Sequence, residues 1–300
     1  MHITLRQMRL FLALAETGSV TAAARLLHVT QPTATMQLQK IAESVGLPLF
    51  EVISKKVYLT EAGRELAQSA RTIASEWEAF DQKMDALRGL TRGRLRVALV
   101  STAKYFVPRL LGAFCEQHPD IEIALEVLNR SGVVNRLREN LDDIYIMSMP
   151  PSDMDVETHV FMPNPLVVIV ASTHPLVQQK SIALSELAGM RFILRESGSG
   201  TRMAVDSFFK NHQFKPNLRL ELGSNEAVKE AVAGNLGIAV LSRHALSGNL
   251  KHHGVEVVNV AGFPIQSNWF IVYPKARQLS PIAKVFLQTL LNSSGSWKLD

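Results

Sequence analysis

The stretch SVTAAARLLHVTQPTATMQLQKI, residues 19–41, decides the fold of the N-terminal part of the chain. Ser19 can cap a helix, and the three alanines from Ala22 to Ala24 allow another helix to approach closely. His28 to Thr30 leave room only for a tight turn, and Pro32 suits the first turn of a following helix. In that helix the apolar residues recur at helical spacing on one side: Ala34, Leu38, Ile41 and Val45. The stretch therefore predicts two short helices joined by a tight turn.

The opposite face of the second helix is mostly polar and nearly free of negative charge. It carries Thr33, Thr35, Met36, Gln37, Gln39 and Lys40. A glutamine can pair with adenine through two hydrogen bonds, and a threonine offers a hydroxyl and a methyl group to base edges. Two short helices, the second with such a face, form a helix-turn-helix. The alternative is an ordinary helical pair with a solvated polar face.

The flanking residues favour the DNA-binding interpretation. Upstream, Thr4 and Gln7 have the spacing of a capping box, and a helix that begins there ends at Gly18. Downstream, the residues around Ile53 to Lys56 predict a short hairpin, or wing, with Lys55 and Lys56 near its tip. Residues 1–60 hold six Lys or Arg against three Glu, a net charge of +3. Lysines at a wing tip can bind phosphates, so the segment predicts a winged helix-turn-helix on duplex DNA.

A long helix follows from Thr60. It would span on the order of 45 Å as far as Leu90. Its apolar residues are separated alternately by four and three positions: Leu66, Ala70, Ile73, Trp77, Phe80, Met84 and Leu87. This heptad seam predicts pairing with a second copy. The alternative is a helix packed on the core of its own domain. Gly89 and Gly93 mark a linker.

From Arg94 onward strands alternate with helices, which predicts largely parallel sheets covered by helices. The alternation of strands and helices begins again near residues 161–166. We therefore expect two α/β lobes, with the chain crossing between them twice. The expected domains are 1–59 for DNA binding, 60–92 for the dimerisation helix, 93–162 plus 267–300 for lobe I, and 163–266 for lobe II. Ligands of such folds bind at the carboxyl ends of strands, between the lobes.

Two loops in this part are candidates for binding an anion. The first follows the first strand and offers Ser101, Thr102 and Lys104. The second, residues 195–202, is rich in glycine, and its candidates are Arg195, Ser199, Thr201 and Arg202. Glycines let backbone N–H groups approach a ligand, and arginine can hold a carboxylate or phosphate through two hydrogen bonds. The alternative for each is a flexible surface loop with a capping hydroxyl.

Composition narrows the class of protein. The 300 residues are 47% hydrophobic, with a net charge of +5 and a pI near 9.4. Cys115 is the single cysteine, which excludes a disulfide framework and a multi-cysteine metal site within the chain. We expect a buried apolar thiol there rather than a nucleophile, no catalytic or metal site, and no cofactor. The sequence shows no export signal and no membrane span, so the cytoplasm is the expected compartment. A solute-binding protein would need that signal. An enzyme is the other alternative, and the sequence shows neither a serine in a nucleophile-elbow pattern nor a helical histidine pair that could hold a metal.

The chain resembles the LysR-type transcriptional regulators. The motifs that carry the resemblance are residues 22–33, AAARLLHVTQPT, then Gly46 to Phe50 and Leu59 to Gly63. The second half is similar to the CbbR regulators of carbon fixation, through residues 101–106, 108–111, 164–166 and 195–202. One departure lies in the wing, where many members carry an arginine after the pair that corresponds to Phe50 and Glu51.

The resemblance implies partners and site residues. It implies a homodimer or a dimer of dimers, operator DNA, RNA polymerase as a further partner, and a periplasmic-binding-protein-like effector domain for a small acidic or phosphorylated metabolite. The residues that it places on DNA are Arg25, Gln31, Pro32, Thr33, Thr35, Gln37, Lys55 and Lys56. The residues that it places in the effector cleft are Ser101, Thr102, Lys104, Ser131, Arg195, Ser199, Thr201 and Arg202.

Overall fold

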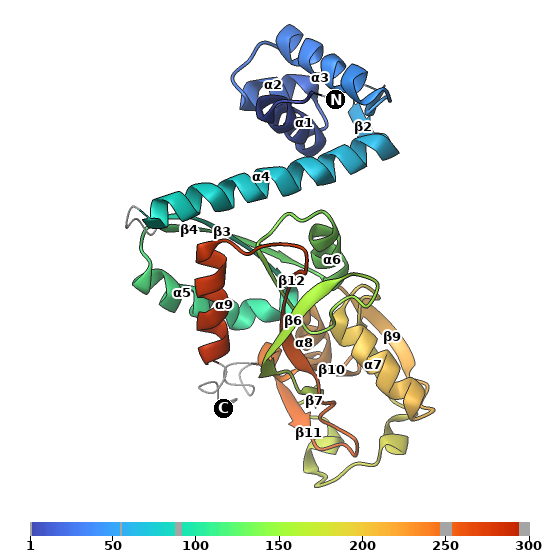
Figure 1. Cartoon of the computed structure of the whole chain (residues 1–300). Coiled ribbons are helices and arrows are strands. Elements are labelled where there is room, and N and C mark those ends of the chain that lie inside the picture. The colour runs from blue at the N-terminus through green and yellow to red at the C-terminus, as the bar shows by residue number, and fades with distance from the viewer. Residues whose placement is uncertain (1, 55, 88–91, 247–253, 294–300) are drawn as a thin grey trace. The chain divides into compact units, whose positions relative to one another are not determined.

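The computed structural model describes residues 2–54, 56–87, 92–246 and 254–293. Contacts divide the chain into two compact units, the first made mainly of residues 1–89 and the second of most of the chain from residue 90 (Figure 1). Among the described residues, no helix is both long and apolar enough to cross a membrane.

The first unit begins with the predicted winged helix-turn-helix, which is confirmed. Its elements are α1 (Leu5–Thr17), α2 (Val20–Leu26), α3 (Gln31–Val45), β1 (Phe50–Ile53) and β2 (Lys56–Leu59). Thr4 caps α1 in a full capping box with Gln7, and Gly18 ends that helix in the left-handed conformation. Strands β1 and β2 pair antiparallel to form the wing. The core beneath is buried leucine, isoleucine and alanine from α1, α2 and α3, centred on Phe11, Leu14 and Leu38.

The long helix α4 (Glu61–Leu87) has 27 residues. Its first turns complete the core of the first unit, because Ala67 is 1% exposed and Leu66 packs against the same cluster. Further along, Ile73, Trp77 and Phe80 are 41%, 45% and 47% exposed, a large fraction for apolar side chains. The helix therefore belongs to the N-terminal core at its start and carries apolar side chains in contact with water beyond it.

Lobe I is one half of the second unit. Its elements are β3 (Gly93–Val100), η1 (Ser101–Tyr105), α5 (Val107–Gln117), β4 (Ile121–Leu128), α6 (Arg130–Arg138), β5 (Ile144–Met147), β6 (Val156–Pro163), β12 (Asn268–Pro274) and α9 (Pro281–Ser293). The sheet order is β4-β3-β5-β12-β6. Strand β3 runs parallel to β4 and β5, whereas β12 is antiparallel to β5 and β6.

Lobe II is the other half. Its elements are β7 (Leu166–Ala171), η2 (Pro175–Gln178), η3 (Leu184–Leu187), β8 (Arg191–Arg195), α7 (Gly200–Asn211), β9 (Asn217–Leu222), α8 (Asn225–Ala233), β10 (Ile238–Ser242), η4 (Arg243–Leu246) and β11 (Val255–Val258). The sheet order is β11-β7-β10-β8-β9, with β8 parallel to β9 and β10 and with β7 antiparallel to β10 and β11.

The two-lobed α/β fold is confirmed, and each sheet is mixed. Four strands of each sheet run in one direction, and one strand runs against them, β12 in lobe I and β7 in lobe II. Strands β6, β7 and β12 flank the two segments that cross between the lobes, where the chain turns back without a helix. The crossings lie side by side, since Asn164 N donates to Ser267 O at 2.8 Å.

Candidate functional site

The polar face of α3 is exposed as the sequence predicts. Ala34, Leu38 and Ile41 are buried on the inner side of the helix. Gln31, Pro32 and Thr33 are exposed on the outer part, and Thr35 and Gln37 are half-buried at its margins. The hydroxyl of Thr35 donates to the backbone oxygen of Gln31 at 3.1 Å, and that of Thr33 pairs with Thr30 at 2.8 Å. The helix thus presents a row of short polar groups.

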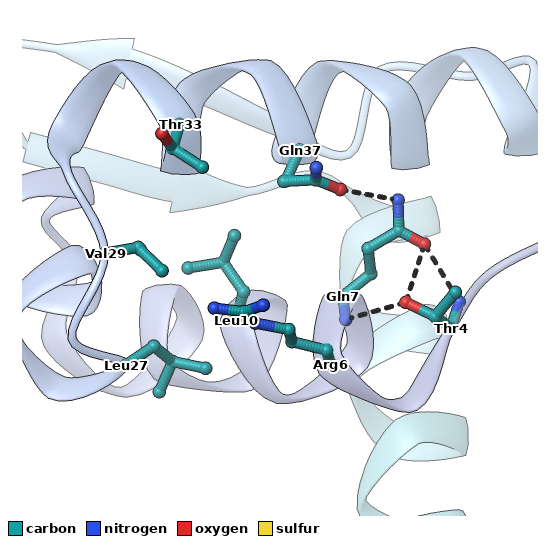
Figure 2. Close-up of a pocket in the computed structure, with 8 residues that line it drawn as sticks. All are labelled: Thr4, Arg6, Gln7, Leu10, Leu27, Val29, Thr33 and Gln37. Carbon is teal, nitrogen blue, oxygen red and sulfur yellow. Dashed lines mark hydrogen bonds between the residues drawn. The ribbon is translucent and has the colours of Figure 1, made fainter.

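A groove of about 300 Å³ runs between α1 and α3 (Figure 2). Its floor is apolar, and its polar lining includes two residues predicted to contact DNA, Thr33 and Gln37. The complete lining is Thr4, Arg6, Gln7, Leu10, Leu27, Val29, Thr33 and Gln37. Gln7 Nε2 donates to Gln37 Oε1 at 2.9 Å across the groove. Sequence reasoning did not connect Gln7 with α3, because the 30 positions between them hide the contact.

The remaining residues predicted to contact DNA lie outside α3. Arg25 on α2 and Lys56 at the start of β2 are both exposed. Lys55 lies outside the described residues. Around Lys56 the wing is apolar, with Val52 62% and Ile53 55% exposed. The wing therefore offers one described cation beside apolar side chains.

The predicted heptad seam divides into two parts. Leu66 packs on the N-terminal core, which agrees with the alternative that the helix packs on the core of its own domain. Beyond it, Ile73, Trp77 and Phe80 are exposed, and the rings of Trp77 and Phe80 lie 5.7 Å apart between centroids. Met84 is half-buried, and the side chain of Leu87 lies outside the described part.

A polar hollow lies between the two lobes, where the carboxyl ends of β3, β4, β5 and β8 meet. It is lined by Val100, Ser101, Thr102, Asn129, Arg130, Ser148, Arg195, Ser199, Gly200 and Thr201. Its free volume is about 10 Å³, room for about one water molecule. Helices α6 and α7 begin at this lining, so their backbone N–H groups favour an anion there. Of the predicted effector residues, the structure brings together Ser101, Thr102, Arg195, Ser199 and Thr201.

Several polar groups of the lining have no partner in the described part of the chain. They include the hydroxyls of Ser148, Ser199 and Thr201, which belong to residues that are 8%, 4% and 6% exposed. Arg130 uses its Nε to bond the backbone oxygen of Met149 at 2.6 Å, and its terminal nitrogens have no bonding partner among the described residues. Burial lowers the pKa of this guanidinium, which still keeps its charge at neutral pH. Sequence reasoning missed Arg130 and Ser148, although both follow strand ends.

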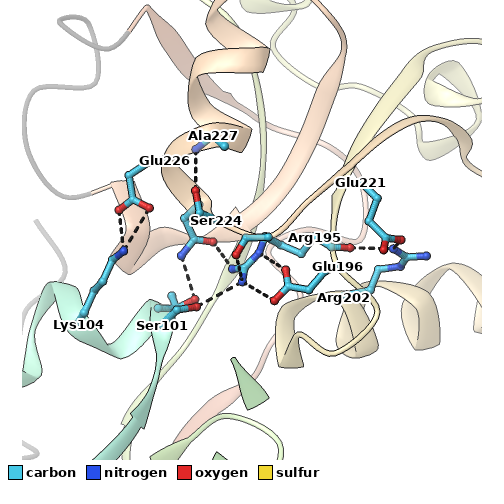
Figure 3. Close-up of polar contacts among 12 residues, drawn as sticks. Ser101, Lys104, Arg195, Glu196, Arg202, Glu221, Ser224, Glu226 and Ala227 are labelled. Carbon is cyan, nitrogen blue, oxygen red and sulfur yellow. Dashed lines mark hydrogen bonds and ion pairs between the residues drawn. The ribbon is translucent and has the colours of Figure 1, made fainter. Parts of the chain in front are cut away.

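The guanidinium of Arg195 is fully engaged by protein groups. Glu196 accepts from its Nε at 2.8 Å and from its Nη2 at 3.0 Å, and Asn225 Oδ1 accepts from its Nη1 at 2.5 Å. Nη2 also reaches Ser101 Oγ at 3.3 Å in the other lobe (Figure 3). The Arg195 side chain is 1% exposed. Although it lines the hollow, it is bound by a carboxylate of its own chain.

Three predicted effector residues, Lys104, Ser131 and Arg202, are not among the residues that line the hollow. Arg202 donates to Glu221 at 2.7 Å, to Asp206 at 2.9 Å and to the backbone oxygen of Arg195 at 2.7 Å, so it fastens the loop from outside (Figure 3). Lys104 pairs with Glu226 at 3.0 Å. Ser131 is exposed, and its backbone N–H donates to Gly198 O at 3.3 Å. Each residue is held by a partner distant in sequence.

Lys104 belongs to a clasp between the lobes. Glu226 of α8 accepts from Tyr105 Oη at 2.6 Å and from Lys104 Nζ, both in lobe I. Burial raises the pKa of Glu226, but the bonds from Tyr105 and Lys104 outweigh it and hold the pKa at about 2. Burial and the same carboxylate raise the pKa of Tyr105. A further bond joins the lobes deeper inside, from Asn225 Nδ2 to Thr102 Oγ1 at 3.0 Å.

Glycines let the loop of residues 195–202 approach lobe I. A Cβ added at Gly198 would lie 2.9 Å from Ser131 Oγ and 3.2 Å from Asn129 Nδ2, and one added at Gly200 would lie 3.0 Å from Ser148 Oγ. These distances are shorter than ordinary carbon contacts, so a side chain at either position would push the neighbouring side chains of lobe I aside. Cys115, expected to be buried, is half-buried in α5.

Two family models match this chain. The model described as "Bacterial regulatory helix-turn-helix protein, lysR family" matches residues 5–64, and "LysR substrate binding domain" matches residues 88–294. Together they cover the DNA-binding segment and both lobes.

Relatives with curated names agree with these matches. HTH-type transcriptional activator CmpR of Synechocystis is 46% identical over 289 residues, 96% of this chain and 95% of its own length. The RuBisCO operon transcriptional regulator of Acidithiobacillus ferrooxidans is 45% identical over 293 residues, 98% of this chain and 95% of its own length. HTH-type transcriptional regulator CbbR of Rhodospirillum rubrum is 40% identical over 286 residues, 95% of both chains. All three are named as regulators rather than as enzymes or transport proteins.

Solved structures extend the comparison. The CcmR regulatory domain of Synechocystis PCC6803, solved in complex with 2-PG, is 43% identical, with a TM-score of 0.66 over 68% of this chain and 98% of that domain. A full-length OxyR variant from Pseudomonas aeruginosa has a TM-score of 0.80 over 100% of this chain and 97% of its own, and at 23% identity it shows the shared fold. The chain therefore belongs to the LysR family of bacterial transcription regulators, in the branch that includes the CbbR regulators.

Proposed function

We propose that this regulator binds a small phosphorylated carboxylate in the interlobe hollow, and that the ligand changes how paired copies bind operator DNA. The observation that carries the ligand proposal is the set of unpartnered donors in a buried site. Ser148, Ser199 and Thr201 supply hydroxyls, and Arg130 supplies the terminal nitrogens of a guanidinium. Hydroxyls, an arginine and helix N-termini together suit phosphate oxygens.

The CcmR domain supports the choice of ligand, since it was solved with 2-phosphoglycolate. This molecule combines a phosphate with a carboxylate on two carbons. In our proposal Arg130 and the start of α6 hold one anionic group, while Ser199, Thr201 and the start of α7 hold the other. Arg195 stays with Glu196 and acts as a rigid wall of the site.

The size of the hollow links binding to movement. Room for about one water does not admit such a ligand, and in our proposal the ligand binds an arrangement in which the lobes stand further apart. The bonds from Arg195 to Ser101 and from Asn225 to Thr102 oppose that arrangement. A ligand that binds only the wider arrangement shifts the population toward it, and this difference in affinity is the source of regulation.

The DNA side of the proposal rests on the exposed face of α3. Gln31, Pro32 and Thr33 lie where they can enter a major groove, with Thr35 and Gln37 at the margins. A pair of chains joined through Trp77 and Phe80 of α4 would place two such helices on successive half-sites. The same proposal includes the cytoplasm as compartment. It also includes contact with RNA polymerase, because the relative CmpR is named an activator.

Calorimetry on the purified full-length protein tests the ligand. We expect 2-phosphoglycolate to bind, and glycolate and inorganic phosphate each to bind more weakly. Arg130→Ala should weaken 2-phosphoglycolate binding by roughly tenfold or more, because a charge-assisted contact is lost. Arg138→Ala is the matched control, since Arg138 forms an exposed pair with Asp153. Equal losses in both variants would refute the assigned site, and a DNA footprint unchanged by saturating ligand would refute the coupling.

A further inference from the structure

Three polar side chains form a continuous line from the start of α1 to the middle of α3 (Figure 2). Thr4 donates to Gln7 Oε1 twice, from its backbone N at 2.9 Å and from its hydroxyl at 3.1 Å. Gln7 Nε2 then donates to Gln37 Oε1 at 2.9 Å. The capping box of α1 thus extends by one hydrogen bond to a residue on the proposed DNA-reading helix.

The direction of every bond in this line is determined. The two ends of a glutamine amide have nearly the same shape, so their hydrogen-bond partners decide which end is oxygen. A backbone N–H can only donate, so the atom of Gln7 beside Thr4 N is the oxygen. The amino group of Gln7 therefore faces Gln37, and the atom that it meets must be the carbonyl oxygen. A rotated Gln37 would bring two amino groups face to face.

The free end of Gln37 is consequently its amino group, which has no partner among the residues that the structure describes. Gln37 lies in the lining of the groove together with Thr33, on the polar side of α3. The bond to Gln7 is partly buried above the apolar floor that Leu10 forms, where water competes less for it.

We propose that Gln7 is a positioning residue for base recognition, which fixes Gln37 so that its amino group faces the DNA. This inference rests on the proposed function, in which α3 enters the major groove. An outward amino group favours base edges that offer only acceptors, namely O6 and N7 of guanine and O4 of thymine, over adenine, whose N7 acceptor stands beside the N6 amino donor, and over cytosine, which offers no acceptor. A freely rotating glutamine would serve donor edges equally well. Gln7, which touches no base in this account, thereby sets a base preference.

The substitution Gln7→Glu reverses the orientation and preserves the helix. Glutamate suits the third position of a capping box, and its charge is favourable at a helix N-terminus. A carboxylate only accepts hydrogen bonds. Gln37 must then turn its amino group toward the new carboxylate and present its carbonyl oxygen to DNA. Donor edges, N6 of adenine and N4 of cytosine, become the favoured ones.

The test is selection from a randomised duplex library by the full-length protein, compared among four variants and the parent. Gln37→Ala identifies the base pair concerned, because preference there is lost. On the strand that Gln37 contacts we expect guanine or thymine for the parent protein. Because every base pair carries one of these two bases on one strand, the deciding result is the change of base on the same strand between the parent and Gln7→Glu. For Gln7→Glu we expect adenine or cytosine, with relative preference changed by about fivefold or more. Gln7→Leu should flatten the preference, and Gln39→Ala, an exposed neighbour bonded to neither residue, should leave that position unchanged.

The outcomes separate this inference from the proposed function. If Gln7→Glu melts like the parent and selects the same base, or if Gln37→Ala alters no position, the positioning role is overturned while sequence-specific binding stands. If Gln7→Glu fails to fold, Gln7→Leu decides, and an unchanged preference in it overturns the role. If the parent selects no sequence at all, the proposed function fails and this inference fails with it.

Discussion

Glu196 holds the guanidinium of Arg195 side-on, with 2.8 Å between Nε and Oε2 and 3.0 Å between Nη2 and Oε1. The arginine is 1% exposed and the glutamate 20%. Two adjacent residues thus form a nearly buried ion pair at the wall of the hollow, in the place where the sequence predicts a clamp for an anion.

Removing Glu196 should show how far the buried Arg195 guanidinium depends on its carboxylate partner. Glu196→Ala leaves a buried charge without its carboxylate, which costs roughly 3 kcal/mol in the free energy of unfolding. An anion from solution can then take the vacated place, so inorganic phosphate should raise the melting temperature of the variant more than that of the parent. Thermal unfolding over a phosphate titration measures this. Glu230→Ala, at an exposed position on α8, is the control. Equal phosphate shifts in parent and variant would contradict the prediction.

Gly198 tests the arrangement of the lobes. In Gly198→Ala the new Cβ is forced against Ser131 Oγ and Asn129 Nδ2, which destabilises the observed arrangement by roughly 1–3 kcal/mol. Because the ligand is proposed to bind a wider arrangement, its affinity should increase severalfold. Calorimetry measures the affinity for the ligand, and thermal unfolding measures the stability of the variant. Gly189→Ala has nothing within 4 Å of its new Cβ and should change neither. A loss of stability together with weaker binding would show that the ligand needs the lobes as observed.

The clasp at Glu226 predicts that the stability of the folded protein depends on pH. Its pKa in the folded protein is about 2, below the ordinary value of 4.5. A carboxyl with a lowered pKa contributes stability above its unfolded pKa and loses it as the pH falls toward the folded value. The difference in melting temperature between the parent and Glu226→Gln should be constant above about pH 5 and shrink from pH 4.5 toward 2. A difference that does not change over this range would show that the clasp contributes nothing through its charge.

The exposed part of the seam predicts the site of self-association. Phe80→Glu places a charge beside Trp77, within the proposed contact between two copies of α4, and should shift the protein toward monomer by at least tenfold in the dissociation constant. Sedimentation velocity over a range of concentrations measures the change. Gln68→Glu adds the same charge at an exposed position on another side of α4 and should have little effect. An unaltered assembly in Phe80→Glu would place the interface elsewhere.

Local signals in the sequence predicted the architecture well. The capping box of Thr4 and Gln7, the stop at Gly18 and the N-cap Ser19 act within a few residues, and the structure has each of them. Strand β6 was missed because it lies at the edge of its sheet, where the burial of its residues does not follow their polarity: Val160 is exposed, whereas Glu157 is half-buried. Long-range ion pairs were also hidden. Glu221 and Glu226 pair with Arg202 and Lys104, and neither glutamate lies near its cation in the sequence. Only Asp206, four residues after Arg202, could have been predicted as a partner.

The apolar face that α4 leaves in water has a consequence for the amount of protein that a cell makes. In the proposed pairing a second chain covers Trp77 and Phe80, which are exposed in the single chain, so part of the folding free energy would depend on concentration. Dilute protein should melt at a lower temperature than concentrated protein. In a cell with few copies, a larger share of molecules would stay single and occupy DNA without cooperation, so gene dosage would itself tune the steepness of the response.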